Sequence, residues 1–144
     1  MNIIGVDVGT VRVGAAWVDS SLGVPFPLAV WERAQGRAEQ ALVSAILERK
    51  AELLVVGMPL DEDGERTAVC DSIERFARRV AKRIEIKVEF VDEAFSSSEA
   101  AELLRAKQGS VGTAKRGAGS GQLGLDAYAA CLILERYCAS LKKS

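Results

Sequence analysis

The chain contains no histidine, and this absence excludes several kinds of chemistry at once. Ser-His-Asp and Cys-His nucleophile systems, histidine general bases and His-ligated zinc all need an imidazole ring. The three cysteines, Cys70, Cys131 and Cys138, are an odd number without CxxC spacing, which indicates neither a disulfide framework nor a structural zinc site. Carboxylate chemistry is what we expect instead, with a hard divalent cation as the partner of the carboxylates.

Long apolar segments and a strong net charge are also missing. No apolar run approaches the roughly 18 residues of a membrane helix, and the N-terminus lacks the features of a signal peptide, so we expect a cytoplasmic protein without a membrane partner. The net charge is −1, so nucleic-acid binding would need a local basic patch. At 144 residues and 49% hydrophobic, the chain should form a single domain over residues 1–144.

The hydrophobic periodicity predicts an α/β fold. Strands are expected at residues 3–8, 12–18, 28–31, 53–57 and 87–91. Helices are expected at residues 38–47, 69–84, 96–107 and 125–140. Tight connections make the first three strands antiparallel, and helical connections make the last two parallel to the first. The expected fold is a five-stranded mixed sheet with helices on both faces.

Asp7 is the most informative residue, because it lies within the apolar run of residues 3–8 (IIGVDV). An ionised carboxylate buried there without a partner would cost several kcal/mol. Asp92 and Glu93 follow the last predicted strand, and Asp126 begins the last predicted helix. Since ligands of such sheets bind at the carboxyl ends of the strands, we predict that Asp7, Asp92, Glu93 and Asp126 meet around a metal ion. Taken alone, Asp126 is equally well explained as a residue favoured at a helix N-terminus by capping and the dipole.

A glycine-rich segment at residues 108–122 carries Lys115 and Arg116 and precedes Asp126. Segments of this composition are usually mobile and often functional. Two interpretations remain open: the two basic residues contact a phosphate backbone beside the metal site, or the segment is a linker without a role in binding.

Four segments of the chain, in order, carry a further signal: residues 5–14 (GVDVGTVRVG), 56–64 (VGMPLDEDG), 91–93 (VDE) and 125–130 (LDAYAA). Together they resemble the successive motifs of the YqgF/RuvX family, the Holliday-junction-resolvase-like proteins that are also described as pre-16S ribosomal RNA nucleases. The resemblance implies a ribonuclease H-like fold, phosphodiester hydrolysis with Mg²⁺ or Mn²⁺, a cytoplasmic location and an ability to form homodimers. The family's catalytic acidic positions fall on Asp7, Glu93 and Asp126, with Asp92 adjacent.

The chain departs from the family pattern by losing positive charge. Val11 and Ala94 stand where the family usually has basic residues, and the basic stretch before the last motif is reduced to Lys115 and Arg116. These two residues and Arg12 are the predicted contacts to nucleic acid. Fewer phosphate contacts would weaken binding or change the preferred substrate.

We therefore predict a metal-dependent nuclease that acts on structured RNA in pre-16S ribosomal RNA processing. Two alternatives stay open: a resolvase of DNA junctions, and a non-catalytic RNA-binding or ribosome-assembly factor that retains the fold. The first motif also resembles the phosphate-binding turn of sugar kinases and actin-like ATPases, but those proteins need a second such domain, for which this chain is too short.

Overall fold

The computed structural model describes residues 1–59, 65–92 and 118–142. In chain order the elements are β1 (Asn2–Val8), β2 (Arg12–Asp19), β3 (Phe26–Glu32), the short 3-10 turn η1 (Ala34–Gly36), α1 (Arg37–Arg49), β4 (Leu53–Met58), α2 (Ala68–Ile84), β5 (Lys87–Asp92) and α4 (Ala118–Lys142).

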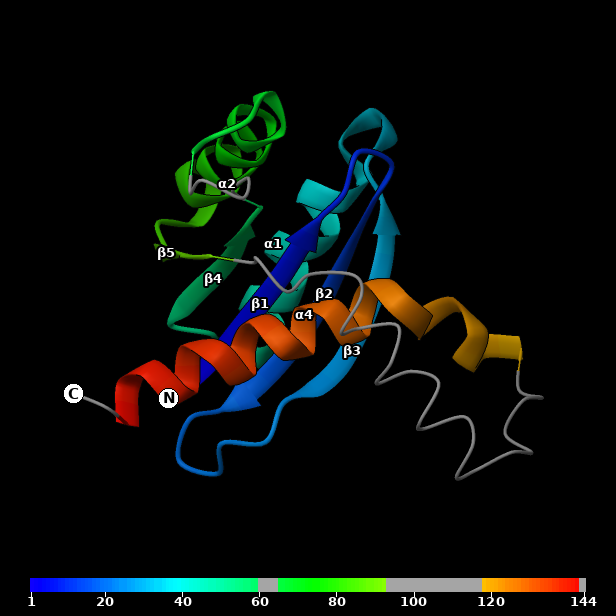
Figure 1. The fold of residues 1–144 in the computed structure, drawn as a ribbon. Helices are drawn as coiled ribbons and strands as arrows, with labels where there is room; N and C mark the ends of the chain where they lie inside the picture. Colours follow the sequence, from blue (N-terminus) through cyan, green and yellow to red (C-terminus); the bar gives the residue numbers. More distant parts are fainter. Residues whose placement is uncertain (60–64, 93–117, 143–144) are drawn as a thin grey trace.

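The five strands form one mixed sheet in the order β3-β2-β1-β4-β5 (Figure 1). β2 pairs antiparallel with both β1 and β3. β4 pairs parallel with both β1 and β5. The predicted sheet and strand directions are therefore confirmed, and each strand begins and ends within two residues of its predicted bounds. Because β1, β4 and β5 are parallel, their carboxyl ends share one edge of the sheet.

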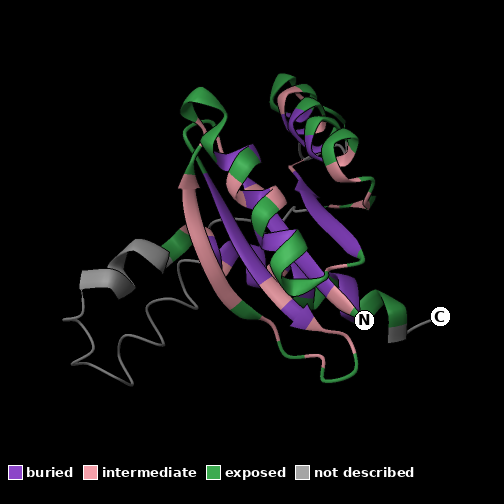
Figure 2. Ribbon diagram, turned by 180° about the vertical axis from the view of Figure 1, so that it is seen from behind, coloured by how far each residue is buried: buried purple, intermediate pink, exposed green. Residues whose placement is uncertain are grey.

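Helices cover both faces of the sheet, as predicted, and each face has its own apolar core. Side chains of β1 alternate between the two, as the period of a strand requires. Ile4 and Val6 belong to the core under α1 and α2, whereas Ile3 belongs to the core under α4. Figure 2 shows α1 and α2 on the face opposite the one that α4 crosses in Figure 1. Asp7 has the same parity as Ile3, so its side chain lies on the α4 face.

Helix α4 begins at Ala118 and not near residue 125, so the predicted start is wrong. The glycines of residues 119–124 lower helix propensity, which is why the sequence pattern favoured a loop there, but packing of α4 on the sheet outweighs that preference. Asp126 therefore lies well inside the helix, and its interpretation as a helix N-terminal residue is wrong. The predicted helix at residues 96–107 lies outside the described residues.

Several contacts fix α4 across the sheet. Leu134 lies against Gly5 of β1, and Arg136 Nη1 donates a hydrogen bond of 2.8 Å to the Asp92 carbonyl at the end of β5. Tyr137 is buried and lies beside Glu89 of β5; burial, followed by the carboxylate of Glu89, raises the pKa of its phenol. Although α4 has 25 residues, no helix among the described ranges is apolar enough over a sufficient length to cross a membrane.

One ion pair joins α1 to α2 at the boundary of the core. Glu39 is 7% exposed, and its Oε2 lies 2.9 Å from Arg79 Nη1. A buried carboxylate that loses its hydrogen-bonding cation keeps its desolvation penalty, so Arg79→Ala should lower the free energy of unfolding by about 1–3 kcal/mol in urea titrations. The matched control is Arg78→Ala, which removes an exposed i,i+4 pair with Glu74 and should change stability little. Equal losses in the two variants would contradict a special role for the Glu39 pair.

Candidate active site

Asp7 stands near the carboxyl end of β1, half-buried on the face that α4 covers. Its partner in the antiparallel ladder is Gly14 of β2. Directly paired residues of antiparallel strands point to the same side of the sheet. The side chain of Asp7 is therefore a neighbour of whatever packs on Gly14.

Asp126 is what packs on Gly14. A Cβ atom added to Gly14 would lie 2.8 Å from the Asp126 Cβ and closer still to its backbone carbonyl, so only glycine lets α4 lie this close to β2. Cross-strand partners have Cβ positions about 4.5–5.5 Å apart, which keeps the Cβ atoms of Asp7 and Asp126 within about 8 Å of each other. The structure thus places the Cβ positions of Asp7 and Asp126, two of the predicted catalytic residues from opposite ends of the chain, close together.

Arg12, a predicted nucleic-acid contact, also lies at this site. Its Nε donates a hydrogen bond of 3.1 Å to Asp126 Oδ2, and the two side chains are 57% and 35% exposed. Arg12 begins β2 immediately after the turn that follows β1, so it stands at the same edge of the sheet as Asp7. Among the residues that the structure describes, the site therefore holds the carboxylates of Asp7 and Asp126 and the exposed guanidinium group of Arg12.

The turn between Asp7 and Arg12 is held by Arg33, which the sequence reasoning did not identify. Gly9 N donates to the Arg12 carbonyl at 2.8 Å, and a Cβ on Gly9 would come within 2.9 Å of that oxygen. The backbone N–H of Arg33 donates to the Val11 carbonyl at 2.8 Å, and its Nη1 donates to the Gly9 carbonyl at 3.0 Å. Arg33 also lies over the ring of the buried Phe76 in α2, 5.4 Å from its centre. No spacing in the sequence indicates this role, because it depends on where β3 ends in space.

Asp92 lies at the expected edge but on the other face. Its partner in the parallel ladder is Met58, whose side chain belongs to the core under α1 and α2. Asp92 is exposed there, while Asp7 and Asp126 lie on the α4 side.

The other predicted site residues, Glu93, Lys115 and Arg116, lie outside the described residues. Among the ranges that are described, no three acidic or cysteine side chains are grouped closely enough to hold a metal.

The donor atoms at this site suit a hard cation. Asp7 and Asp126 offer carboxylate oxygens, which Mg²⁺ and Mn²⁺ prefer, and the chain has no imidazole that would favour zinc. The residues present therefore fit a divalent ion held by oxygen ligands. Which ion it is, and whether Glu93 completes the site, stay predictions.

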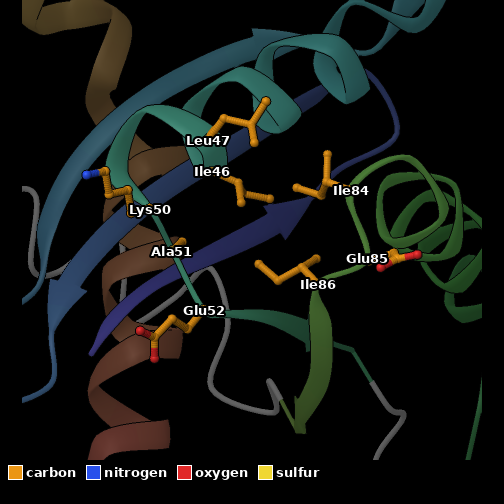
Figure 3. A pocket seen from close by; sticks show the side chains of 8 residues that line it. All are labelled: Ile46, Leu47, Lys50, Ala51, Glu52, Ile84, Glu85 and Ile86. Atoms are coloured by element: carbon orange, nitrogen blue, oxygen red, sulfur yellow. The ribbon is translucent and has the colours of Figure 1, made fainter.

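A cavity of about 440 Å³ lies elsewhere in the molecule (Figure 3). It opens between the ends of α1 and α2 and the starts of β4 and β5, at the opposite edge of the sheet from Asp7. Ile46, Ile84 and Ile86 point toward its centre, whereas Lys50 and Glu85 point away from it. Most of its lining is aliphatic, and the charged residues Lys50 and Glu85 at its rim point away from it, so the pair of Asp7 and Asp126 remains the better candidate.

The architecture is that of the ribonuclease H-like resolvases. RuvC of T. thermophilus, solved in complex with a Holliday junction substrate, superposes with a TM-score of 0.61 over 99% of this chain and 96% of that chain, at 14% identity. The Fowlpox virus resolvase, solved with substrate Holliday junction DNA, gives a TM-score of 0.61 over 98% and 99% of the two chains, at 15% identity. At this level of identity the likeness establishes the fold, and the predicted fold class is confirmed.

The chain belongs to the family described as RuvX: Holliday junction resolvase, whose model matches residues 1–140. Among its relatives is a protein of Synechococcus elongatus named "Putative pre-16S rRNA nuclease", 35% identical over 136 residues that span 93% of this chain and 86% of the relative. A protein of the same name from Maridesulfovibrio salexigens is 34% identical over 143 residues, 96% and 98% of the two chains. The resemblance carried by the four sequence motifs is thus confirmed.

The contact between Gly14 and Asp126 can be tested by a matched pair of substitutions. Gly14→Ala pushes a methyl group into α4 at Asp126, and Gly5→Ala pushes one into Leu134, 2.6 Å from its Cγ. Both variants should melt at lower temperature, since both crowd the same helix. Of the two variants, we expect Gly14→Ala alone to weaken Mn²⁺ binding as well, by about tenfold or more, because it displaces Asp126, a proposed metal ligand. Equal losses of Mn²⁺ affinity would show that the position of Asp126 over Gly14 is unimportant for the site.

Proposed function

We propose that this chain is a divalent-metal-dependent nuclease that hydrolyses phosphodiester bonds in structured RNA and acts in the cytoplasm on pre-16S ribosomal RNA. The observation that carries the proposal is the juxtaposition of Asp7 and Asp126 over Gly14. Membership of the RuvX family and the names of the relatives support the class of reaction and the substrate.

In this proposal Asp7 and Asp126 hold the metal, and each is positioned by rigid structure. Asp7 is fixed by its place in the β1–β2 ladder, and Asp126 by the packing of α4 on Gly14. When bound, the ion would activate a water molecule and stabilise negative charge on the scissile phosphate. Arg12 is exposed beside the two carboxylates, where its guanidinium group can contact a phosphate. Lys115 and Arg116 are proposed as further phosphate contacts.

Glu93 is the third ligand in the proposal, in preference to Asp92. Met58 is the partner of Asp92 and faces the α1 and α2 core, so Asp92 is on the wrong face to join Asp7 directly. Glu93, which falls on an acidic position of the family's motif, is therefore the candidate that remains for the third ligand. Exchange of Asp92 for Asn should accordingly affect catalysis much less than exchange of Glu93 for Gln.

Resolution of DNA junctions is the second candidate. The description of the family and the two resolvases solved with Holliday junctions favour it. Its chemistry would be the same, and only the nucleic acid would differ. A four-way junction has two equivalent strands to cut, so this activity would also require the homodimer that the family resemblance implies.

A cleavage assay separates the two candidates. Purified protein is incubated with a labelled pre-16S ribosomal RNA fragment or a DNA four-way junction, in Mg²⁺, in Mn²⁺ or in EDTA. We expect metal-dependent cleavage of the RNA, no cleavage in EDTA and no cleavage by Asp7→Asn. Preferential cutting of the junction would favour the second candidate, whereas cleavage that persists in Asp7→Asn or in EDTA would reject the proposed site.

Thermal melting tests the metal site without any nucleic acid. A ligand that binds only the folded state stabilises it by about 2.7 kcal/mol at one hundred times its Kd, so Mn²⁺ should raise the Tm of the wild type. Asp7→Asn should abolish this rise, and without metal it should melt at or above the wild-type temperature because it relieves repulsion from Asp126. The matched control is Asp71→Asn, an exposed carboxylate of α2, which should retain the rise. A clearly lower Tm of metal-free Asp7→Asn would instead assign Asp7 a structural role.

A further inference from the structure

The ion pair between Arg12 and Asp126 affects how the proposed site binds a divalent cation. Asp126 is a proposed metal ligand, yet its Oδ2 accepts a hydrogen bond from Arg12 Nε at 3.1 Å. A guanidinium group and a divalent cation are both attracted to the same carboxylate oxygen, and they repel each other. Asp126 Oδ2 therefore cannot bind the guanidinium group and the cation together as strongly as it would bind either one alone.

We propose that Arg12 is the resident counter-ion of Asp126 in the metal-free protein, and that it leaves Asp126 when a divalent cation binds. This inference rests on the proposed metal site and adds its regulation. Arg12 limits the repulsion between Asp7 and Asp126 while no metal is bound, and in doing so it lowers the affinity of the site for metal. Arg12 is thus a positioning residue for Asp126 before it is a contact for nucleic acid.

The surroundings of Arg12 suit a side chain that changes partner while its backbone stays in place. The turn that carries it is held by Arg33, through hydrogen bonds to the Gly9 and Val11 carbonyls. Its side chain is 57% exposed and, among the described residues, makes a polar contact to Asp126 through Nε alone. Its two Nη groups take no part in that hydrogen bond, and a guanidinium group binds phosphate well.

Metal binding and nucleic-acid binding should therefore assist each other. Metal at Asp126 releases Arg12 for a phosphate, and a phosphate that draws Arg12 away leaves Asp126 open to metal. Coupling between two binding events is reciprocal, so each ligand must raise the affinity for the other by the same factor. The metal half of this cycle can be measured with no nucleic acid present.

The test is Mn²⁺ binding to the full chain, followed by the paramagnetic resonance of free Mn²⁺. Arg12→Gln should bind Mn²⁺ about two- to five-fold more tightly than the wild type, the factor expected from losing a partly exposed ion pair. Arg12→Lys retains the charge and should stay near the wild-type affinity. The matched control is Arg78→Gln, which removes the same charge and an exposed ion pair on α2, away from the site, and should change nothing.

The substitution Asp126→Asn makes the test specific. If Arg12 acts through Asp126, the gain from Arg12→Gln should disappear when Asp126→Asn is already present. Unchanged or weaker Mn²⁺ binding by Arg12→Gln would overturn the inference, while metal binding by the wild type would leave the proposed function standing. If neither the wild type nor Arg12→Gln binds Mn²⁺, the inference and the proposed metal site both fail.

Discussion

The close approach of α4 to β2 at Gly14 is the contact on which the candidate site depends. Asp7 reaches its place through a strand ladder that any sheet of this topology would form. Asp126 reaches its place only because a helix from the other end of the chain lies against a residue without a side chain. Interiors are packed densely enough that one added methyl group has an effect, so a side chain at Gly14 would displace Asp126 from its place beside β2.

The charges at the site follow from that geometry. Two carboxylates on one face of a sheet repel, and Asp126 has the partly exposed guanidinium group of Arg12, at the start of β2, as a partner. Repulsion of this kind lowers the stability of the fold. It is expected at functional sites, which often contain arrangements that are locally destabilising but needed for function. Elsewhere the protein keeps the usual rules: its one buried charged residue among those described, Glu39, has Arg79 as its partner.

Sequence reasoning predicted the sheet well because strand periodicity and connection lengths constrain it strongly. It also placed Asp7 and Asp92 at one edge, since parallel strands share their carboxyl ends. It did not predict which face of the sheet each side chain occupies, because that depends on the strand register. Asp92 pairs with Met58 and therefore lies on the face opposite Asp7. The predicted start of α4 was wrong because the glycines before residue 125 have low helix propensity, whereas tertiary packing stabilises the helix there.

The spacing of residues along the sequence did not predict contacts between distant segments. Arg33 holds the turn after β1 through two carbonyls and the ring of Phe76, and none of these contacts has a signature in spacing. The same is true of the Arg12 to Asp126 pair, which joins residues 114 positions apart. Both arginines lie at the site, so the second layer of residues around the carboxylates is where a three-dimensional structure adds most to the motifs.

In the proposed site, Asp7 and Asp126 together hold one divalent ion. A crystal of the protein grown with Mn²⁺ and measured for anomalous scattering tests this directly. We expect an anomalous peak within coordination distance of both carboxylates, with the Arg12 side chain turned away from Asp126. A well-ordered site with no peak between them, and with Arg12 still bonded to Asp126 at saturating Mn²⁺, would contradict it.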